Sequence, residues 1–403
     1  MVLPSPDKKQ HASADEKQGS PGNQHTPAEK RAVQDRPLPP ARLRIGIVYD
    51  RIADYAHAEG PADRFAEFEP ETTIKSMEEA IRLTGHQPVR IGSPPRLLDA
   101  RPDVDLVWNI GEGYGSRNRE AWAPVLCEMH GIPCLGSDAY ALTVTLDKVL
   151  TKQIARVLDI PTTDCQVIPY CEVSRHDPVS APVAFPGSGS GSGSGPDSRS
   201  IPVPDPILPF PQFLKPRYEG TSKGITEKSV VHTPDEFRSR CRYLLETYRQ
   251  DVLAEPFLSG AELTCALAGH PLQALPVMER GLHSSGIGSH AVDNSHHLQS
   301  LTGETGRNPD SDSDIHVTGA ITPELEADIT KWSHRLCGEL GIRDFVRIDF
   351  KLTGDGRPMF LEANPLPTFG IDSTFAILAE IRGEPYPAFL SGILSAAIRR
   401  LKL

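Results

Sequence analysis

A short segment near the end of the chain carries the pattern that most restricts its fold. Two apolar stretches, 345–352 and 358–361, flank a turn at Gly354-Asp355-Gly356. A Gly-containing turn between two such stretches is typical of a β-hairpin. The hairpin also predicts which side chains share a face, because successive side chains of a strand point to opposite sides.

Four polar residues of this hairpin are expected to gather in one patch. Alternation places Arg347 and Asp349 on one face of the first strand, and Glu362 and Asn364 on one face of the second. Carboxylate and amide oxygens suit Mg²⁺, which usually takes one or two carboxylates together with substrate phosphates. The ordinary alternative is a surface hairpin whose charges are solvated.

Composition limits the classes of protein to consider. The length of 403 residues suggests two or three domains, and the net charge of −11 argues against nonspecific nucleic-acid binding. The seven cysteines are odd in number and form no Cys-x-x-Cys pair, so we expect a reducing cytoplasm and no disulfide framework or zinc site. No apolar run approaches the ~20 residues of a membrane span, so no membrane partner is expected.

The first ordered part reads as a parallel α/β domain. Strand patterns near 43–49, 88–91, 105–110 and 133–135 alternate with helical patterns at 73–84 and 119–130. We expect four units in the chain. These are a disordered tail over 1–42, this domain over 43–140, a central domain over 141–257 with a flexible Gly-Ser-rich insertion at 171–209, and a C-terminal domain over 258–403.

The remaining pattern is helical at 146–158, 234–248, 323–340, 375–382 and 387–401. It indicates strands at 252–257, 262–268 and 275–278, and a long polar loop at 283–316.

A hydroxyl-rich loop follows Lys215 and includes Glu219, Ser222 and two glycines, Gly220 and Gly224. Successive backbone N–H groups in such a loop can cradle an anion, with the lysine adding positive charge. An ordinary β-turn is the alternative, and the spacing is not that of a Walker A loop.

Two further segments carry charged residues at suggestive places. Lys148 and Lys152 lie one turn apart on a helix, where they either meet a phosphate or form a solvated face. Glu255 ends a strand, and Glu262 follows a bend after it. We interpret this bend as a hinge whose peptide groups read an adenine edge and whose Glu262 accepts from ribose hydroxyls.

These pieces, in this order, resemble the ATP-grasp superfamily, and most closely its D-alanine–D-alanine ligase branch. The resemblance covers about residues 43–403 apart from the insertion. It implies a three-domain ATP-grasp architecture, with the Rossmann-like parallel α/β domain first and ATP between the central and C-terminal domains. It also implies a carboxylate–amine ligase that acts on small amino-acid substrates, uses Mg²⁺ (two ions, with Mn²⁺ a possible substitute) and can form a homodimer.

The resemblance also assigns roles residue by residue. For the nucleotide, it implies that Lys148 and Lys215 contact the ATP phosphates, that Glu255 lies at the adenine hinge and that Glu262 holds the ribose. It places Glu219 and Ser222 in the phosphate or substrate loop. It further implies that Asp349, Glu362 and Asn364 bind metal and that Arg347 stabilises an oxyanion.

The first domain departs from the ligase pattern. Tyr49-Asp50-Arg51 stands where the family has Gly-Gly-x-Ser, and the segment 109–120 carries Asn-Arg-Glu in place of the expected Glu-Asp. The acid that receives a substrate ammonium is then Glu71 or, equally, Glu69. Ser373 either contacts a substrate carboxylate or is a plain helix N-cap. A true D-alanine–D-alanine ligase and a catalytically dead nucleotide-binding regulator remain the alternatives.

Overall fold

The computed structural model describes residues 42–55, 57–171, 202–280, 315–316 and 321–403. The expected tail, most of the 171–209 insertion and most of the 283–316 loop lie outside these residues. Residues 42–403 form one compact unit, so the expected boundaries after 140 and 257 stay a prediction. Within the described helices, none is long and apolar enough to cross a membrane.

The first sheet is parallel throughout, as predicted, in the order β2-β1-β3-β4. Its strands are β1 (Arg44–Val48), β2 (Gln87–Gly92), β3 (Leu106–Asn109) and β4 (Cys134–Leu135), and its helices are α1 (Glu71–Leu83), α2 (Arg96–Asp99) and α3 (Trp122–Met129). The helix expected at 119–130 begins instead with a 3₁₀ turn, Arg119–Ala121. The carboxyl ends of parallel strands meet at one edge, where such sheets bind ligands.

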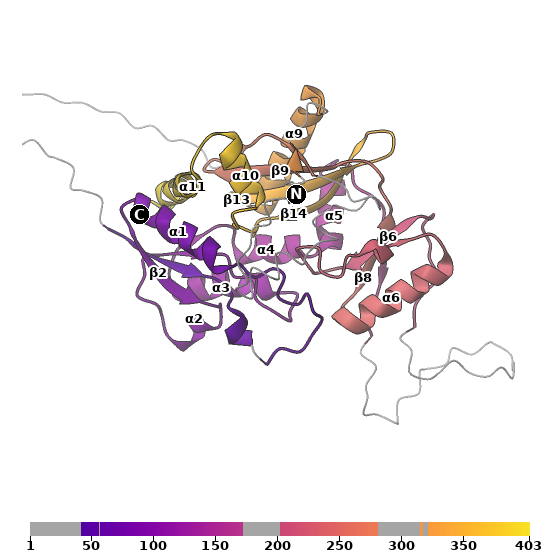
Figure 1. Ribbon diagram of the computed structural model, residues 1–403, viewed down its shortest axis with the longest axis horizontal. Helices are drawn as coiled ribbons and strands as arrows, with labels where there is room; N and C mark the ends of the chain where they lie inside the picture. The colour runs from indigo at the N-terminus through magenta and orange to yellow at the C-terminus, as the bar shows by residue number, and fades with distance from the viewer. Residues whose placement is uncertain (1–41, 56, 172–201, 281–314, 317–320) are drawn as a thin grey trace, which may run out of the picture. The chain divides into compact units, whose positions relative to one another are not determined.

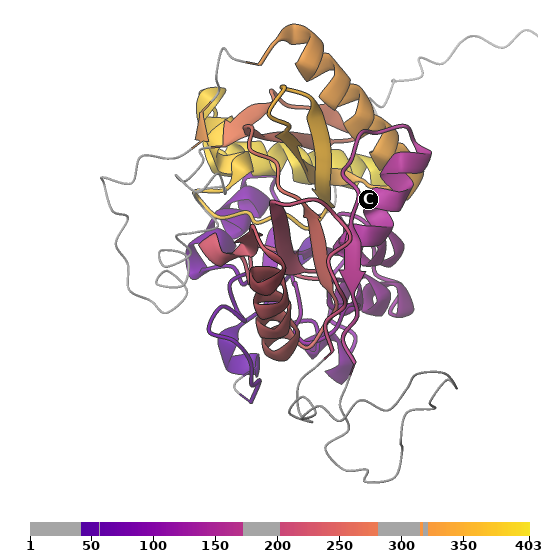
Figure 2. The same ribbon diagram turned by 90° about the vertical axis from the view of Figure 1, so that its right-hand side faces the viewer.

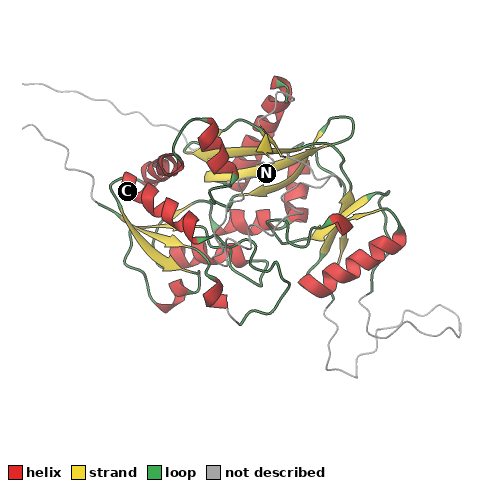
Figure 3. Ribbon diagram, viewed as in Figure 1, coloured by secondary structure: helices red, strands yellow, loops and turns green. Residues whose placement is uncertain are grey.

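The second sheet is antiparallel and small (Figure 3). It has the order β5-β8-β6-β7, with strands β5 (Gln166–Ile168), β6 (Gln212–Pro216), β7 (Val230–Val231) and β8 (Val252–Pro256). Helix α6 (Pro234–Tyr248) has the predicted bounds and is capped by Thr233. It covers one face of this sheet through Phe237 and Leu244 (Figure 2).

The helix expected at 146–158 is present as α5 (Lys148–Val157). A further helix, α4 (Ala139–Leu146), was not expected, and the two meet at Asp147. The Asp147 side chain accepts from the N–H groups of Val149 and Leu150, and so caps a new helix. Its carboxylate also pairs with Arg217, 2.7 Å away, which holds the break in place.

The third sheet carries the predicted hairpin. Its order is β12-β11-β9-β13-β14, with β10 paired to β9. The strands are β9 (Glu262–Gly269), β10 (Gln273–Ala274), β11 (Met278–Arg280), β12 (Ile315–His316), β13 (Asp344–Leu352) and β14 (Pro358–Asn364). The strand expected at 275–278 is wrong, because Pro276 lacks a backbone N–H and leaves two short strands on either side of it.

The first sheet and the C-terminal helices share one buried core. Helices α9 (Pro323–Leu340), α10 (Thr374–Ile381) and α11 (Tyr386–Leu401) follow the predicted patterns. Helix α11 lies beside α1 (Figure 1). The buried cluster includes Ile45 and Trp108 from the first sheet, together with Phe369 and Leu390 from the C-terminal part.

A glycine fixes the crossing between the second and third sheets. Gly260 lies between β8 and β9, and an added Cβ would lie 2.6 Å from the carbonyl oxygen of Leu352. We therefore expect Gly260→Ala to lower the free energy of unfolding by about 1–3 kcal/mol in urea titrations. Gly338→Ala is the matched control, because nothing lies within 4 Å of its Cβ position. This helix substitution should stabilise by about 0.5–1 kcal/mol, and equal effects at both glycines would contradict the prediction.

Candidate active site

The hairpin places the four polar residues as predicted. Arg347 pairs with Asn364 across the two strands, and Asp349 pairs with Glu362. On the other face of β13, Val346 and its neighbours lie in a buried apolar cluster. Alternation along β13 puts Arg347 and Asp349 on one face, and a one-residue register shift between Asp349 and Phe350 brings Glu362 and Asn364 opposite them.

Asp349 is held in place by two hydrogen bonds. The Thr264 hydroxyl donates to its Oδ1 at 2.7 Å, and Arg347 Nε donates to its Oδ2 at 3.0 Å. Asp349 is 3% exposed, so neither contact is diluted by solvent. The solvated-hairpin alternative is wrong for this residue.

Glu362 is ionised by its neighbours. Lys148 Nζ lies 3.3 Å from its Oε2. Burial would raise the pKa of Glu362, but Lys148, Lys215 and Arg347 outweigh burial and lower the pKa to about 2. The carboxylate therefore carries its negative charge at neutral pH.

The donor set fits a magnesium ion that also binds phosphate. Asp349, Glu362 and Asn364 offer two carboxylates and one amide, and each carboxylate oxygen has lone pairs beyond those used. The Asn364 oxygen accepts from the backbone N–H of Leu366 at 3.3 Å. Among the described residues, no cluster of three or more His, Cys, Asp or Glu forms a self-sufficient metal site. Substrate oxygens would have to complete the coordination.

Glu255 lies between two buried lysines. Lys152 Nζ is 2.6 Å from one of its oxygens, and Lys215 Nζ is 2.9 Å from the other. Burial would raise the pKa of Glu255, but the two ammonium groups hold it well below its ordinary value. The solvated-face alternative is wrong for Lys152, which is 0% exposed. The side chain of Glu255 is thus used inside the protein, and only the backbone near it can read a base edge.

Glu262 lies on the same sheet as the hairpin. It opposes Lys351 across β9 and β13, and their charged groups are 3.9 Å apart. The next pair along on this face is Asp349 with Thr264. The structure therefore brings Glu262 to the edge of the polar patch.

The loop after β6 differs from the open anion cradle that the sequence suggested. The backbone N–H of Gly220 donates to Glu67 at 2.7 Å, and that of Gly224 donates to Asp63 at 2.9 Å. Two of the expected anion donors are therefore bound to carboxylates of the protein itself. Ser222 has a left-handed backbone, with φ of 56°, and its carbonyl accepts from Ile225. The Glu219 carbonyl accepts from Lys148, which joins the loop to the hairpin.

Of the two acids proposed to receive an ammonium, the structure brings only Glu69 inward. Glu71 lies at the surface, 2.8 Å from Arg90, with its side chain 53% exposed. Glu69 is buried, and it accepts from the N–H of Phe369 at 2.6 Å and from the hydroxyl of Thr73 at 2.8 Å. The structure thus disfavours Glu71, because the helix that begins there turns its side chain outward.

Ser373 caps helix α10, as one alternative held. Its Oγ accepts from the N–H of Ala376 at 3.4 Å. Contact with a substrate carboxylate stays a prediction.

Burial makes Glu69 pH-sensitive. It raises the pKa of Glu69 from 4.5 to about 7. A group raised in this way stabilises the fold below its unfolded pKa and loses that contribution as the pH rises through the folded pKa. Compared with Glu69→Gln, the wild type should therefore lose about 3 kcal/mol of unfolding free energy between about pH 4 and pH 8. Urea titrations across this range test it. Glu71→Gln should keep the wild-type profile, and parallel profiles for wild type and Glu69→Gln would contradict the prediction.

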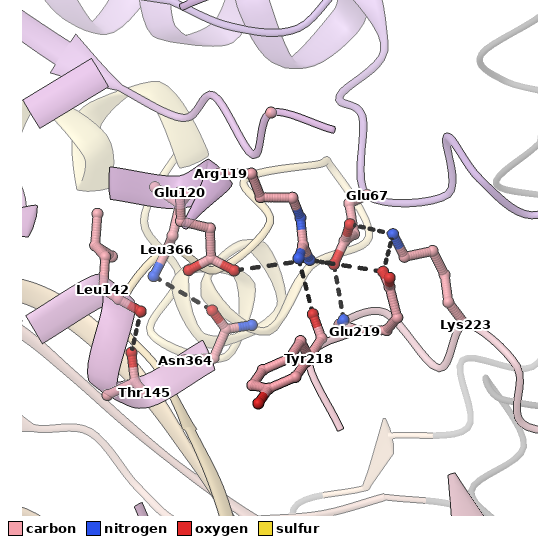
Figure 4. Close-up of polar contacts among 12 residues, drawn as sticks. Glu67, Arg119, Glu120, Leu142, Thr145, Tyr218, Glu219, Lys223, Asn364 and Leu366 are labelled. Atoms are coloured by element: carbon pink, nitrogen blue, oxygen red, sulfur yellow. Dashed lines mark hydrogen bonds and ion pairs between the residues drawn. The ribbon is translucent and has the colours of Figure 1, made fainter. Parts of the chain in front are cut away.

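A buried ionic cluster was missed by the sequence reasoning (Figure 4). It joins Glu67 to Arg119 at 2.8 Å and to Lys223 at 2.6 Å. Arg119 had been noted only as part of a variant segment and Lys223 only as part of the loop, and Glu67 was not noted. The one available signal was the alternation Phe65-Ala-Glu67-Phe-Glu69, which puts two acids among buried aromatics. A cleft of about 670 Å³ lies against this cluster, and Arg119, Glu219 and Lys223 line part of it.

The comparison with known families matches the site region. Residues 205–395 fit the family model described as D-ala D-ala ligase C-terminus, and this range contains the loop and the whole hairpin. The chain is an ATP-grasp protein that resembles the D-alanine–D-alanine ligase branch. It belongs with the ATP-dependent ligases that form an amide bond.

Individual relatives agree at low identity. The chain is 27% identical to the uncharacterized protein y4sG of Sinorhizobium fredii, over 73% of this chain and 75% of that protein. It is 24% identical to a D-alanine–D-alanine ligase of Aquifex aeolicus, over 80% of this chain and 94% of that enzyme.

Solved structures of this branch share the ATP-grasp fold. A D-alanine–D-alanine ligase from Bacillus anthracis complexed with ATP superposes with a TM-score of 0.60 at 19% identity, covering 89% of this chain and 99% of that one. The VanG D-Ala:D-Ser ligase from Enterococcus faecalis gives 0.60 at 16%, covering 88% and 99%. At this identity the match shows the fold alone.

Proposed function

We propose that the protein is a carboxylate–amine ligase that joins an amino acid, or a small carboxylic acid, to an amine through an acyl phosphate. The observation that carries this proposal is the hairpin register. It sets Arg347 opposite Asn364 and Asp349 opposite Glu362 on one polar face, on which Asp349 is buried. A regulator without activity would have no need to keep these four groups together.

The chemistry explains why these groups are needed. A carboxylate is a poor electrophile, so its oxygen first attacks the γ-phosphorus of ATP and ADP leaves. The amine then attacks the acyl carbon and loses a proton. The bond between that carbon and the phosphate oxygen breaks, and phosphate leaves. Arg347 would stabilise the oxyanion that develops at that carbon, because its guanidinium is fixed against Asp349 before substrate arrives.

Asp349, Glu362 and Asn364 would hold the divalent cations, two Mg²⁺ by the family resemblance, with Mn²⁺ a possible substitute. Bound Mg²⁺ would neutralise charge on the transferred phosphoryl group and align it. The protein's part is to hold the two carboxylates in register and to keep Glu362 ionised, which the neighbouring cations Lys148, Lys215 and Arg347 support.

The nucleotide would lie along the same face. Lys148 and Lys215 would contact its phosphates, since both ammonium groups already act on Glu362. Glu262 would accept from the ribose at the edge of the patch. The adenine edge would meet backbone groups beside Glu255, because the side chain of Glu255 is used by Lys152 and Lys215.

The amino-acid substrate would lie between this face and the first sheet. Glu69 replaces Glu71 in our proposal for the group that receives an ammonium, because only Glu69 faces inward. Ser373 and the loop residues Glu219 and Ser222 would bound the substrate. Glu69, just before α1, accepts from the backbone N–H of Phe369 in the segment after β14, which supports this placement.

A narrower candidate is a true D-alanine–D-alanine ligase, favoured by the names of the relatives. The departures in the first domain weigh against it. Arg119, which belongs to the variant segment, is buried in an ion pair with Glu67.

An assay of the purified protein tests the proposal. ATP-dependent phosphate release should rise when an amino acid and an amine acceptor are added, and EDTA should abolish the increase. A panel of both enantiomers, with D-alanine included, separates the narrower candidate from the broader one. ATP binding without release for any pair would count against ligase activity. Light scattering of the same sample tests the homodimer.

A further inference from the structure

The carboxylate of Glu67 is the centre of a buried contact between two distant segments. It receives Arg119 at 2.8 Å, Lys223 at 2.6 Å and the backbone N–H of Gly220 at 2.7 Å. Glu67 and Arg119 are each 3% exposed and Lys223 is 5% exposed. Three donors on one carboxylate make a strong, charge-assisted contact, because burial removes the competing water.

The same segment binds the loop at a second point. Asp63 accepts from the N–H of Gly224 at 2.9 Å and from the hydroxyl of Tyr248 at 2.6 Å. Arg119 also donates to the carbonyl of Tyr218 at 2.8 Å, just before the loop begins. We call residues Asp63, Glu67 and Arg119 the clamp. It holds both ends of the loop 219–224.

The loop needs such support from outside. Thr221 and Ser222 both have left-handed backbones, with φ of 43° and 56°, a conformation that costs free energy for residues other than glycine. At Gly220 an added Cβ would lie 2.6 Å from Glu67 Oε1. Glycine there lets the carboxylate approach the backbone closely.

The loop in turn sets the place of a residue at the polar face. The Glu219 carbonyl accepts from Lys148 Nζ, and the same ammonium lies 3.3 Å from Glu362 Oε2. A shift of the loop would therefore move Lys148 relative to the hairpin. Geometry of this kind matters, since a displacement of about 1 Å can cost roughly 10²-fold in rate.

We propose that Glu67 is a positioning residue, which holds the loop 219–224 and through it Lys148 in the place that phosphoryl transfer requires. This rests on the proposed ligase function. The ionisation state agrees with it. Burial would raise the pKa of Glu67, but Arg119 and Lys223 outweigh burial and lower the pKa to about 2. Arg119 also lies 3.7 Å from Glu219 and 3.9 Å from Glu120, and Lys223 pairs with Glu219 as well as with Glu67.

The test combines hydrogen exchange with kinetics on the full chain. In Glu67→Gln, exchange at the Gly220 amide should accelerate at least about tenfold, because the ionic contact that covers it is lost. The kcat of the ligase reaction should fall about 10–100-fold, while KM for the amino acid changes less than about threefold. A merely structural role would not produce this split. Glu78→Gln is the matched control, since Glu78 pairs with Arg82 and Arg90 at the surface.

Two further variants keep the proposal falsifiable. If Glu67→Gln does not fold, Gly220→Ala replaces it, because this change displaces the carboxylate and removes no charge. Asp63→Asn should speed exchange at Gly224 in the same way. Unchanged exchange at Gly220 in a folded variant would overturn the proposal. So would faster exchange with a wild-type kcat.

Failure of the ligase function can be told apart from failure of the clamp. If the wild type turns over no substrate pair, hydrogen exchange at the Gly220 amide and the Kd for Mg-ATP test the positioning role of Glu67 instead. The proposal then requires Glu67→Gln to weaken Mg-ATP binding at least about fivefold, because Lys148 loses its place at the phosphates. A Kd equal to that of the wild type would overturn it.

Discussion

Glu362→Gln is expected to lower kcat by about 10³-fold, with little change in the fold. Glutamine keeps the size of the side chain but removes the charge that Lys148 and Lys215 stabilise. Metal assistance contributes several kcal/mol to phosphoryl transfer, and each 1.36 kcal/mol corresponds to a factor of ten in rate. The measurement is steady-state ADP release at saturating Mg²⁺, with circular dichroism to verify folding.

The hairpin supplies a matched control for this experiment. Asp355 lies at the exposed tip of the same hairpin and pairs with Arg357. Asp355→Asn should therefore turn over like the wild type. Asp349→Asn should behave like Glu362→Gln, because the two carboxylates face each other across the strands. Wild-type kcat in both active-face variants would remove the basis for a metal site here.

The second large effect concerns stability. Glu255→Gln should lower the free energy of unfolding by about 3–5 kcal/mol, because two buried ammonium groups lose their shared carboxylate. Lys152, 0% exposed, has no route to water without local unfolding. Urea titration followed by circular dichroism measures the loss.

A second substitution separates charge from packing. Adding Lys152→Met to Glu255→Gln removes one of the stranded charges, and should restore part of the lost stability. Asp235→Asn, at an exposed surface pair, should leave the transition unchanged. A double variant less stable than Glu255→Gln would show that the lost packing, and not the unpaired ammonium, dominates.

Local sequence patterns predicted most strands, the hairpin and the faces of its side chains, because these features depend on alternation and on the turn. Strand periodicity predicted that Arg347 and Asp349 share one face and that Glu362 and Asn364 share one face, but these pairs meet through a one-residue register shift beyond Asp349, which the turn alone does not predict. The parallel first sheet follows in the same way from its alternating strands and helices.

The features that the sequence did not predict depend on contacts between residues far apart in the chain. Glu67 and Arg119 are 52 positions apart, and no local signal links them. Glu69 and Glu71 differ by two positions, yet only the docking of the Phe369 backbone decides which one is buried. The break at Asp147 separates the expected helix α5 from α4, which the sequence pattern did not indicate. It is held by Arg217, 70 positions away.

The core that the first sheet shares with helix α11 affects how the protein folds during its synthesis. Side chains of β1 and β3 are buried together with side chains of the last helix, which ends at Leu401. At roughly 5–20 residues per second, a ribosome needs roughly 10–50 s to travel from the end of the first sheet to that helix. Throughout this interval the nascent first domain has an uncovered apolar face. Chaperone binding during translation would protect it until the final helix emerges.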